Sequence, residues 1–145
     1  MAYLQGFGPE GDFLRGRFDA QWVDGSPSAA RTAVAWGNAS FTPPDAAWVR
    51  FNVNHFPLAE IASFGSAGSN LRRVDGTVLV EVFVPMNGGE GAIDDYCDLV
   101  AAVYRDVTSQ QGLRFGEASM TNVGPQDAWF KKDVLVPFVR DTVFT

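Results

Sequence analysis

The sequence predicts a single α+β domain over residues 1–145, with a mostly antiparallel sheet of about four to five strands. A long helix is expected on one face of that sheet, and a second helix at the N-terminus. Two observations support this. Strand-like segments surround one internal segment with helical spacing, an order typical of α+β folds. The length of 145 residues and the hydrophobic content of 46% fit one domain with one core.

The N-terminal segment 9–22 predicts the first helix. Leu14, Phe18 and Trp22 are spaced four apart, so they form one apolar stripe. The DGSPS sequence at 24–28 contains turn-forming residues. We therefore expect the helix to end there.

Three strands are expected next, at residues 32–36, 48–56 and 72–85. Apolar and polar residues alternate along 48–56, which is typical of a half-buried strand. The segment 72–85 has apolar residues on both faces, which indicates a central strand or one whose second face contacts a partner. Residues 64–70 are rich in Gly and Ser and predict a loop.

A second helix is expected at residues 92–110, because its apolar residues recur at helical spacing. Cys97 lies on the apolar side of this helix and is interpreted as a small buried hydrophobe. Asp94, Asp95 and Asp98 crowd its N-terminal end, where carboxylates complement the helix dipole.

Two further strands are expected at residues 114–123 and 129–139. Proline has no backbone N–H to donate, so it is normally confined to sheet edges and bulges. Pro137 lies inside the last of these segments. The sequence therefore predicts that this strand is an edge strand or carries a bulge.

The composition excludes several classes of protein. The chain has 11 Lys+Arg and 17 Asp+Glu, a net charge of −6, which argues against tight sequence-specific binding of duplex DNA. The same charge is compatible with a passage through which DNA slides. We expect no membrane span and no signal peptide, because no apolar run is long enough. A single Cys excludes an internal disulfide and a Cys-based zinc cage.

No catalytic, cofactor-binding or metal site is predicted. The Gly-rich turn at residues 87–91 lacks both the third glycine of a dinucleotide fingerprint and the GK[ST] of a P-loop. The acids that follow it lack the spacing of an EF-hand. Ser63, Ser66 and Ser69 do not form a GxSxG elbow, and His55 is the one candidate base in the sequence.

Aromatic residues suggest a different role. Trp36, Trp48 and Trp129 lie beside expected strands. Each is either a core residue or part of an assembly surface, because Trp and Arg are the residues most enriched in interface hot spots.

A series of motifs runs through most of the chain from about residue 32. It reads VAWGNASFTPPDAAWVRFNV, then LRRVDGTVLVEVFVPMNGGEG, then AIDDYCDLVAAVYRD, then DAWFKKDVLVPFVRD. This series resembles that of the tail terminator (tail-completion) proteins of long-tailed phages and of phage-like gene transfer agents. In that family an aromatic-rich strand ending in RF is followed by a loop, an Arg and a strand ending in VFVP. A Gly-rich turn, a helix and a strand ending in VPF come next.

The resemblance implies a structural virion protein without enzymatic activity or cofactor. Such proteins form a six-membered ring at the head-proximal end of the tail tube. The ring stops tube polymerisation, and DNA passes through its centre. The implied partners are further copies of the chain, the tail tube protein and a head-side connector protein. Assembly would take place in the host cytoplasm, without a membrane.

A closed ring requires two different complementary surfaces on each subunit. The charged residues offer a basic and an acidic group for this role. The candidate interface residues are Arg50, Arg72, Arg73, Lys131 and Lys132 on the basic side, and Asp94, Asp95, Asp98 and Asp106 on the acidic side.

Two alternatives stay open. The first is another ring protein of the phage neck, such as a head-closure or head–tail connector protein. The second is a small hydrolase that uses His55 as its base.

Overall fold

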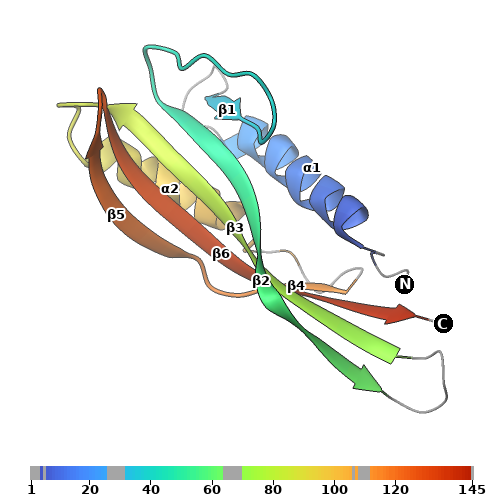
Figure 1. The fold of residues 1–145 in the computed structure, drawn as a ribbon. Helices are drawn as coiled ribbons and strands as arrows, with labels where there is room; N and C mark the ends of the chain where they lie inside the picture. The colour runs from blue at the N-terminus through green and yellow to red at the C-terminus, as the bar shows by residue number, and fades with distance from the viewer. Residues whose placement is uncertain are drawn as a thin grey trace.

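The computed structural model describes residues 4, 6–25, 32–63, 70–105, 107 and 112–144. Side chains are described for these residues except 23–25, 57–63, 70–72 and 143–144. Figure 1 shows one strongly twisted sheet with both helices on the same side of it.

The sheet is mixed but mostly antiparallel. Its strand order is β1-β2-β3-β6-β4, and β5 also pairs with β6. Only the β1–β2 pair is parallel among the described strands. The predicted α+β class is confirmed, with six strands in place of four to five. The elements are α1 (Phe7–Gly25), β1 (Ala33–Ala35), β2 (Trp48–Ser63), β3 (Asn70–Pro85), α2 (Gly91–Val103), β4 (Leu113–Phe115), β5 (Ser119–Gln126) and β6 (Trp129–Phe144).

The main core lies between the sheet and the two helices. Successive side chains of a strand point to opposite faces, so each long strand presents alternate residues to the helices. The stripe predicted for the first helix is fully buried, and Cys97 is buried as expected. The core joins Leu14, Phe18 and Trp22 of α1, Ile93, Cys97 and Val100 of α2, Val49 and Phe51 of β2, Val78, Val80 and Val82 of β3, and Val134, Val136 and Phe138 of β6.

Helix α2 ends at Val103, so the prediction of a helix to residue 110 is wrong for the described residues beyond Val103. Tyr104 caps the helix, and its hydroxyl donates a hydrogen bond to the Leu14 carbonyl at 2.6 Å. Arg17 Nε donates to the Val103 carbonyl at 2.9 Å. The contact with Arg17 of α1 therefore satisfies the Val103 carbonyl at this helix end. Beyond Val103 the apolar side chain of Tyr104 packs into the core from a turn and not from a further turn of helix.

Strand β6 is central and pairs with β3 without a register shift, so the prediction that this strand is an edge strand or carries a bulge at Pro137 is wrong. In antiparallel strands the N–H and C=O of one residue point to the same neighbour. The Pro137 carbonyl accepts a hydrogen bond from Gly116 N–H at 2.8 Å. The position of the missing N–H therefore faces residues 116–118, where the neighbouring strand is interrupted. This interruption also explains why the single strand predicted at 114–123 is two strands, β4 and β5.

Three strands are longer than predicted and build an arm, defined as residues 57–63 of β2, 70–75 of β3 and 139–144 of β6. In Figure 1 these ends project beyond both helices. The register between β2 and β3 shifts between His55 and Ala59, at the base of the arm. The loop predicted at 64–70 lies outside the described residues except for Asn70, which begins β3.

Gly76 permits a close approach of chains where the arm begins. It pairs with Phe138 of β6. A Cβ at this position would lie 2.6 Å from Phe138 Cζ and 2.7 Å from the Asn54 carbonyl oxygen. The absent side chain therefore lets the Phe138 ring pack over the backbone of β3.

A buried polar network fixes the start of α1 against β6 and β2. Arg140 Nε donates to Glu10 Oε1 at 2.9 Å, and both side chains are almost completely buried. Glu10 Oε2 lies 2.6 Å from His55 Nε2. Arg140 also donates to the Thr142 hydroxyl, which donates in turn to the Leu4 carbonyl. Both ends of the described chain are thus joined through one set of hydrogen bonds.

We predict that Arg140→Met destabilises the fold by about 3–5 kcal/mol, because it leaves the Glu10 carboxylate buried without its cation. Urea denaturation measures the free energy of unfolding. The matched control is Arg15→Met, whose ion pair with Asp12 is exposed on α1 and is expected to change stability by less than about 1 kcal/mol. Equal effects of the two substitutions would contradict a structural role for the buried pair.

Two glycines provide a second prediction. Gly76→Ala is expected to destabilise the protein by about 2 kcal/mol or more, because the new methyl group collides with Phe138 and with backbone. Gly16→Ala, with open space at its Cβ inside α1, is expected to stabilise it by about 0.5–1 kcal/mol. Thermal and urea unfolding of both variants measure the contrast. A Gly76→Ala protein as stable as the parent would refute the close contact.

Candidate functional site

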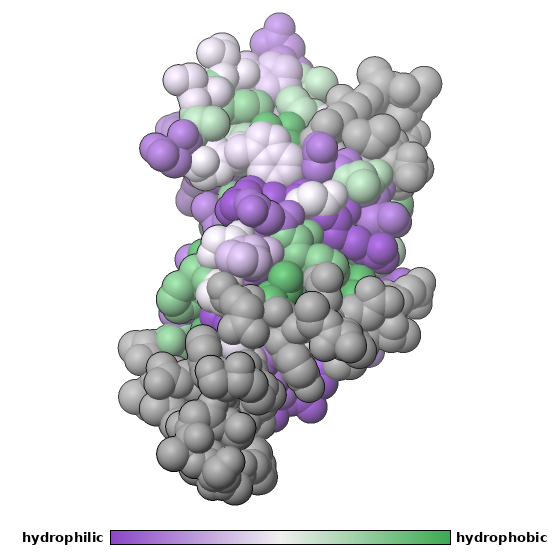
Figure 2. All heavy atoms as spheres, turned by 90° about the vertical axis from the view of Figure 1, so that its right-hand side faces the viewer, coloured by the Kyte–Doolittle hydropathy of each residue, from purple (hydrophilic) through white to green (hydrophobic). Residues whose placement is uncertain are grey.

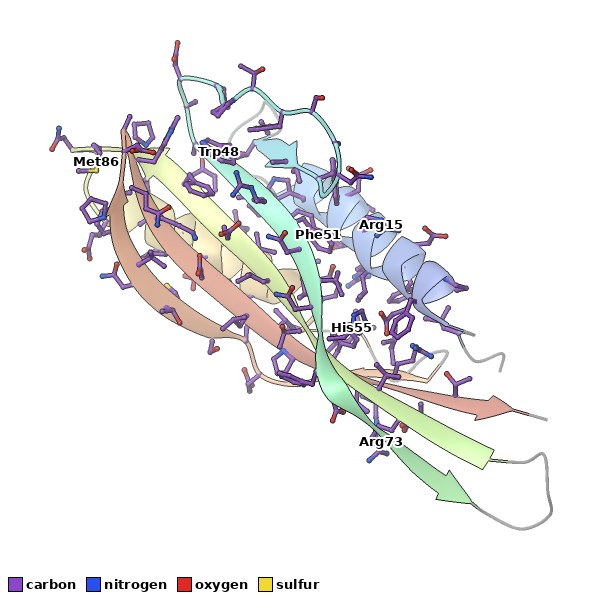
Figure 3. All side chains as sticks on the ribbon, in the orientation of Figure 1. Arg15, Trp48, Phe51, His55, Arg73 and Met86 are labelled. Carbon is purple, nitrogen blue, oxygen red and sulfur yellow. The ribbon has the colours of Figure 1, made fainter. Side chains whose placement is uncertain are left out.

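Three of the charged residues predicted from the sequence, Arg50, Arg73 and Lys131, lie on the open face, defined as the side of the sheet opposite the helices. Two clusters lie on it. The Glu81 cluster (Arg50, Asn52, Glu81, Lys131, Asp133) is near the start of β2, and the Asp141 cluster (Arg73, Arg114, Asp141) is on the arm. Figure 3 shows this separation, since Trp48 and Arg73 lie toward opposite ends of the sheet. Leu79 and Leu135 are paired neighbours between the clusters.

In the Glu81 cluster, one carboxylate contacts three side chains. Lys131 Nζ donates to Glu81 Oε1 at 2.6 Å, and Arg50 and Asn52 approach Oε2 at 3.5 and 3.3 Å. Lys131 Nζ also lies 3.4 Å from Asp133 Oδ1. The charges are therefore compensated within one subunit.

The pKa values in this cluster reflect burial and pairing. Burial is the largest single effect on Lys131 and lowers its pKa, but the hydrogen bonds and charges of Glu81 and Asp133 together outweigh it, so the pKa is above its ordinary value. Burial raises the pKa of Asp133 despite the nearby Lys131 ammonium. Lys131 thus stays charged.

Aromatic rings pack beneath and beside this cluster. Trp48 stacks on Phe83 with ring centroids 4.0 Å apart, and Trp129 meets Trp48 edge-on at 5.9 Å. The Arg50 guanidinium lies over both stacked rings, at 5.3 and 5.6 Å. Trp48 is buried, whereas Trp36 and Trp129 are partly buried against the two hydrophobic clusters. Trp48 is therefore a core residue of the single subunit.

In the Asp141 cluster, two guanidiniums share one carboxylate. Arg73 donates through Nε and Nη2 to the two Asp141 oxygens at 2.7 and 3.0 Å, and Arg114 donates at 3.1 Å. The hydrogen bond from Arg73 lowers the pKa of Asp141 below its ordinary value. The side chain of Arg114 is half exposed, so this end of the open face carries an accessible cation.

Lys132 lies on the opposite, helix-covered face. Its ammonium donates to Asp94 Oδ1 at 2.6 Å, with Glu90 3.8 Å away. The hydrogen bond to Asp94 raises the pKa of Lys132. One expected basic residue and one expected acidic residue are thus joined inside a single subunit, where they attach α2 to β6.

The other predicted interface residues are distributed differently. Asp95 and Asp98 are exposed on α2, and neither has an ion pair within the described part of the chain. The side chain of Arg72 and all of Asp106 lie outside the described residues.

The network of Glu10, Arg140 and His55 was not predicted from the sequence. Its members are 45 and 130 residues apart in the chain, so no local spacing identifies it. His55, the base of the hydrolase alternative, contacts Glu10 and the ring of Phe7. Of the three serines considered with it, Ser66 and Ser69 and the side chain of Ser63 lie outside the described residues. The described residues contain no group of three or more candidate metal ligands.

Two grooves open between these elements. One, of about 440 Å³, lies between α2 and the β4–β5 segment, with Tyr104, Phe115, Met120 and Val134 among its walls. Burial raises the pKa of the Cys97 thiol at its base to about 12. The other, of about 520 Å³, is mostly apolar and crosses the sheet at Pro137. Asp98, Glu117 and Ser119 also line the first groove, and no hydrogen bond joins any of them to Cys97 among the described side chains.

The comparisons with known proteins give the fold and nothing further. No protein-family model matches this sequence. No curated protein sequence matches it. One solved structure, whose name states no function, has a TM-score of 0.61 and 19% sequence identity; the match covers 93% of this chain and 97% of that one. Within the described residues, neither helix has the length and apolarity needed to cross a membrane.

We predict that the stabilising effect of Asp141 depends on pH. Its lowered pKa means that the folded state favours the carboxylate, so its contribution is complete at neutral pH and is lost as the pH falls through the folded-state pKa. Wild type is therefore expected to be more stable than Asp141→Asn at pH 7, with the difference shrinking toward pH 3. Urea denaturation across this range measures it, and a difference independent of pH would refute the pairing.

Proposed function

We propose that the chain is a structural subunit of a phage-type particle, and that it acts as a tail terminator. In this role several copies of the chain, related by rotation, form a ring at the head-proximal end of the tail tube. The ring stops tube polymerisation and docks the head-side connector, while DNA passes through the lumen. The ordered motifs that resemble this family are the sequence basis of the proposal.

The structural observation that carries the proposal is the asymmetry of the sheet. Helices cover one face, while the other face presents two charge clusters separated by apolar residues. The arm extends this sheet beyond the helices (Figure 1). A cyclic ring needs two unlike surfaces on each subunit, and an elongated, one-sided sheet offers them.

The electrostatics support the same role. The net charge of −6 opposes adhesion of DNA to a lumen. The exposed Asp95 and Asp98 of α2 contribute acidic surface, whereas most of the predicted cations are neutralised by neighbouring carboxylates. Figure 2 shows hydrophilic and hydrophobic atoms side by side on the flank of the molecule near the chain termini. Interfaces between separately folded chains have about the same apolar share as other protein surface, so this mixed flank is compatible with a contact between copies.

We predict that particles lacking this chain have abnormally long tails that are not joined to heads, because nothing stops the polymerisation of the tube. Negative-stain electron microscopy of particles with and without the chain measures tail length and attachment. Restoring the chain to the same particles is the control.

Two other outcomes would redirect the proposal. Filled heads without tails would indicate a head-closure or head–tail connector protein. Normal particles would contradict a structural role. A His55→Ala protein that folds and still restores normal tails would argue against the hydrolase alternative.

A further inference from the structure

Two edges of the sheet are free along part of their length. β1 pairs with β2 only from Trp48 to Arg50, and no other described strand lies on that side of β2. On the opposite side of the sheet, β5 pairs with β6 and with no further described strand. A free strand edge presents unpaired backbone N–H and C=O groups to any chain that can approach it.

Neither edge carries a charged side chain along its free stretch. Natural edges are commonly blocked by charged side chains, above all lysine. The free part of β2, residues 51–56, reads FNVNHF, and β5 reads SMTNVGPQ, with no Asp, Glu, Lys or Arg in either. Almost every residue of β5 is exposed.

The free segments have similar lengths, because local features end each of them. On β2, the free stretch begins after Arg50, the last residue that pairs with β1. It ends near the register shift between His55 and Ala59. On β5, the register shift between Asn122 and Gly124 and the following Pro125 leave Ser119–Asn122 as the regular part. Each edge therefore offers a short, regular stretch of four to six residues.

Exposed apolar side chains concentrate at the same two edges. The described residues expose five large hydrophobic side chains. Phe56 belongs to β2, and Phe7 contacts His55 next to it. Met120 and Val123 belong to β5. Four of the five are thus placed beside a free edge, where a second chain would cover them.

The side chains of the two edges can be assigned to faces. Met120 and Asn122 pair with Val134 and Lys132, so they lie on the helix-covered face, as do Val53 and His55 of β2. Thr121 pairs with Asp133 on the open face, where Asn54 also lies. Antiparallel pairing with Asn54 opposite Thr121 would join two polar residues on the open face and place Met120 opposite His55 on the helix-covered face.

Strand direction defines the geometry of the contact. Strands β2, β3, β6 and β5 alternate in direction, so β2 and β5 run in opposite directions. A second copy placed by rotation about an axis along the strands keeps these directions. We propose that β2 of one copy pairs antiparallel with β5 of the next copy, so that one sheet continues through the assembly. This contact is heterologous and can close into a ring, and it deepens the proposed function on which it rests.

Cysteine cross-linking tests the contact. Asn54→Cys and Thr121→Cys are made as separate proteins in a Cys97→Ala background, mixed in equal amounts and oxidised. The two sulfurs of paired edges meet at an effective concentration in the millimolar range, so at micromolar protein the 54–121 disulfide is expected to form about 100-fold faster than in a control mixture. The control mixture pairs Ser40→Cys, on an exposed loop, with Thr121→Cys.

The outcomes separate the alternatives. Disulfides joining 54 to 54, or 121 to 121, would indicate a two-fold dimer and overturn the proposal. The proposal would also be overturned if the disulfide between residues 54 and 121 formed in no greater yield than the control disulfide, at any protein concentration up to the millimolar range.

Charge substitutions provide a second measurement. Asn54→Lys combined with Thr121→Lys places like charges on both edges and is expected to abolish assembly, whereas Asn54→Lys combined with Thr121→Glu is expected to retain it. Tail length in particles carrying each variant separates the two proposals. Normal tails with the doubly lysine-substituted chain would overturn the edge contact but leave the terminator role intact. Normal tails without the chain would contradict the terminator role itself.

Discussion

The pairing of β3 with β6 is the constraint on which the rest of the structure depends. The two strands pair without a register shift from Asn70↔Phe144 to Pro85↔Trp129. Because side chains alternate between faces, a slip of one residue would turn the valines of the slipped strand away from the helices and bury its charges. The fixed register therefore defines both the core and the open face, and it brings Glu81 beside Lys131 and Arg73 beside Asp141.

A second constraint joins the ends of the chain to this frame. Arg140 on β6 and Glu10 on α1 are buried together, and His55 adds a contact from β2. A buried ion pair contributes little net stability compared with an apolar pair of the same shape, but loss of one partner is costly. The network therefore favours one placement of α1 over alternatives. Since Phe7 packs against His55, that placement also determines which apolar surface lies next to the free edge of β2.

The functional features share one physical origin, which is an elongated sheet covered on one side only. The uncovered side holds charges that are mostly neutralised within the subunit, so it can approach another surface at a small desolvation cost compared with isolated charges. The edges carry the exposed apolar residues. A chain built in this way has a surface suited to contacts with other chains along its sheet.

The elements whose signals are local could be predicted from the order of the residues. The spacing of Leu14, Phe18 and Trp22 and the alternation along β3 follow from helix and strand periods, which are written in neighbouring residues. Only the tertiary structure decided where these elements stop and what their charges contact. The central place of β6 depends on a gap opposite Pro137, and the pairing of Lys132 with Asp94 depends on how α2 crosses the sheet. Those outcomes depend on residues far apart in the chain, so no local pattern encodes them.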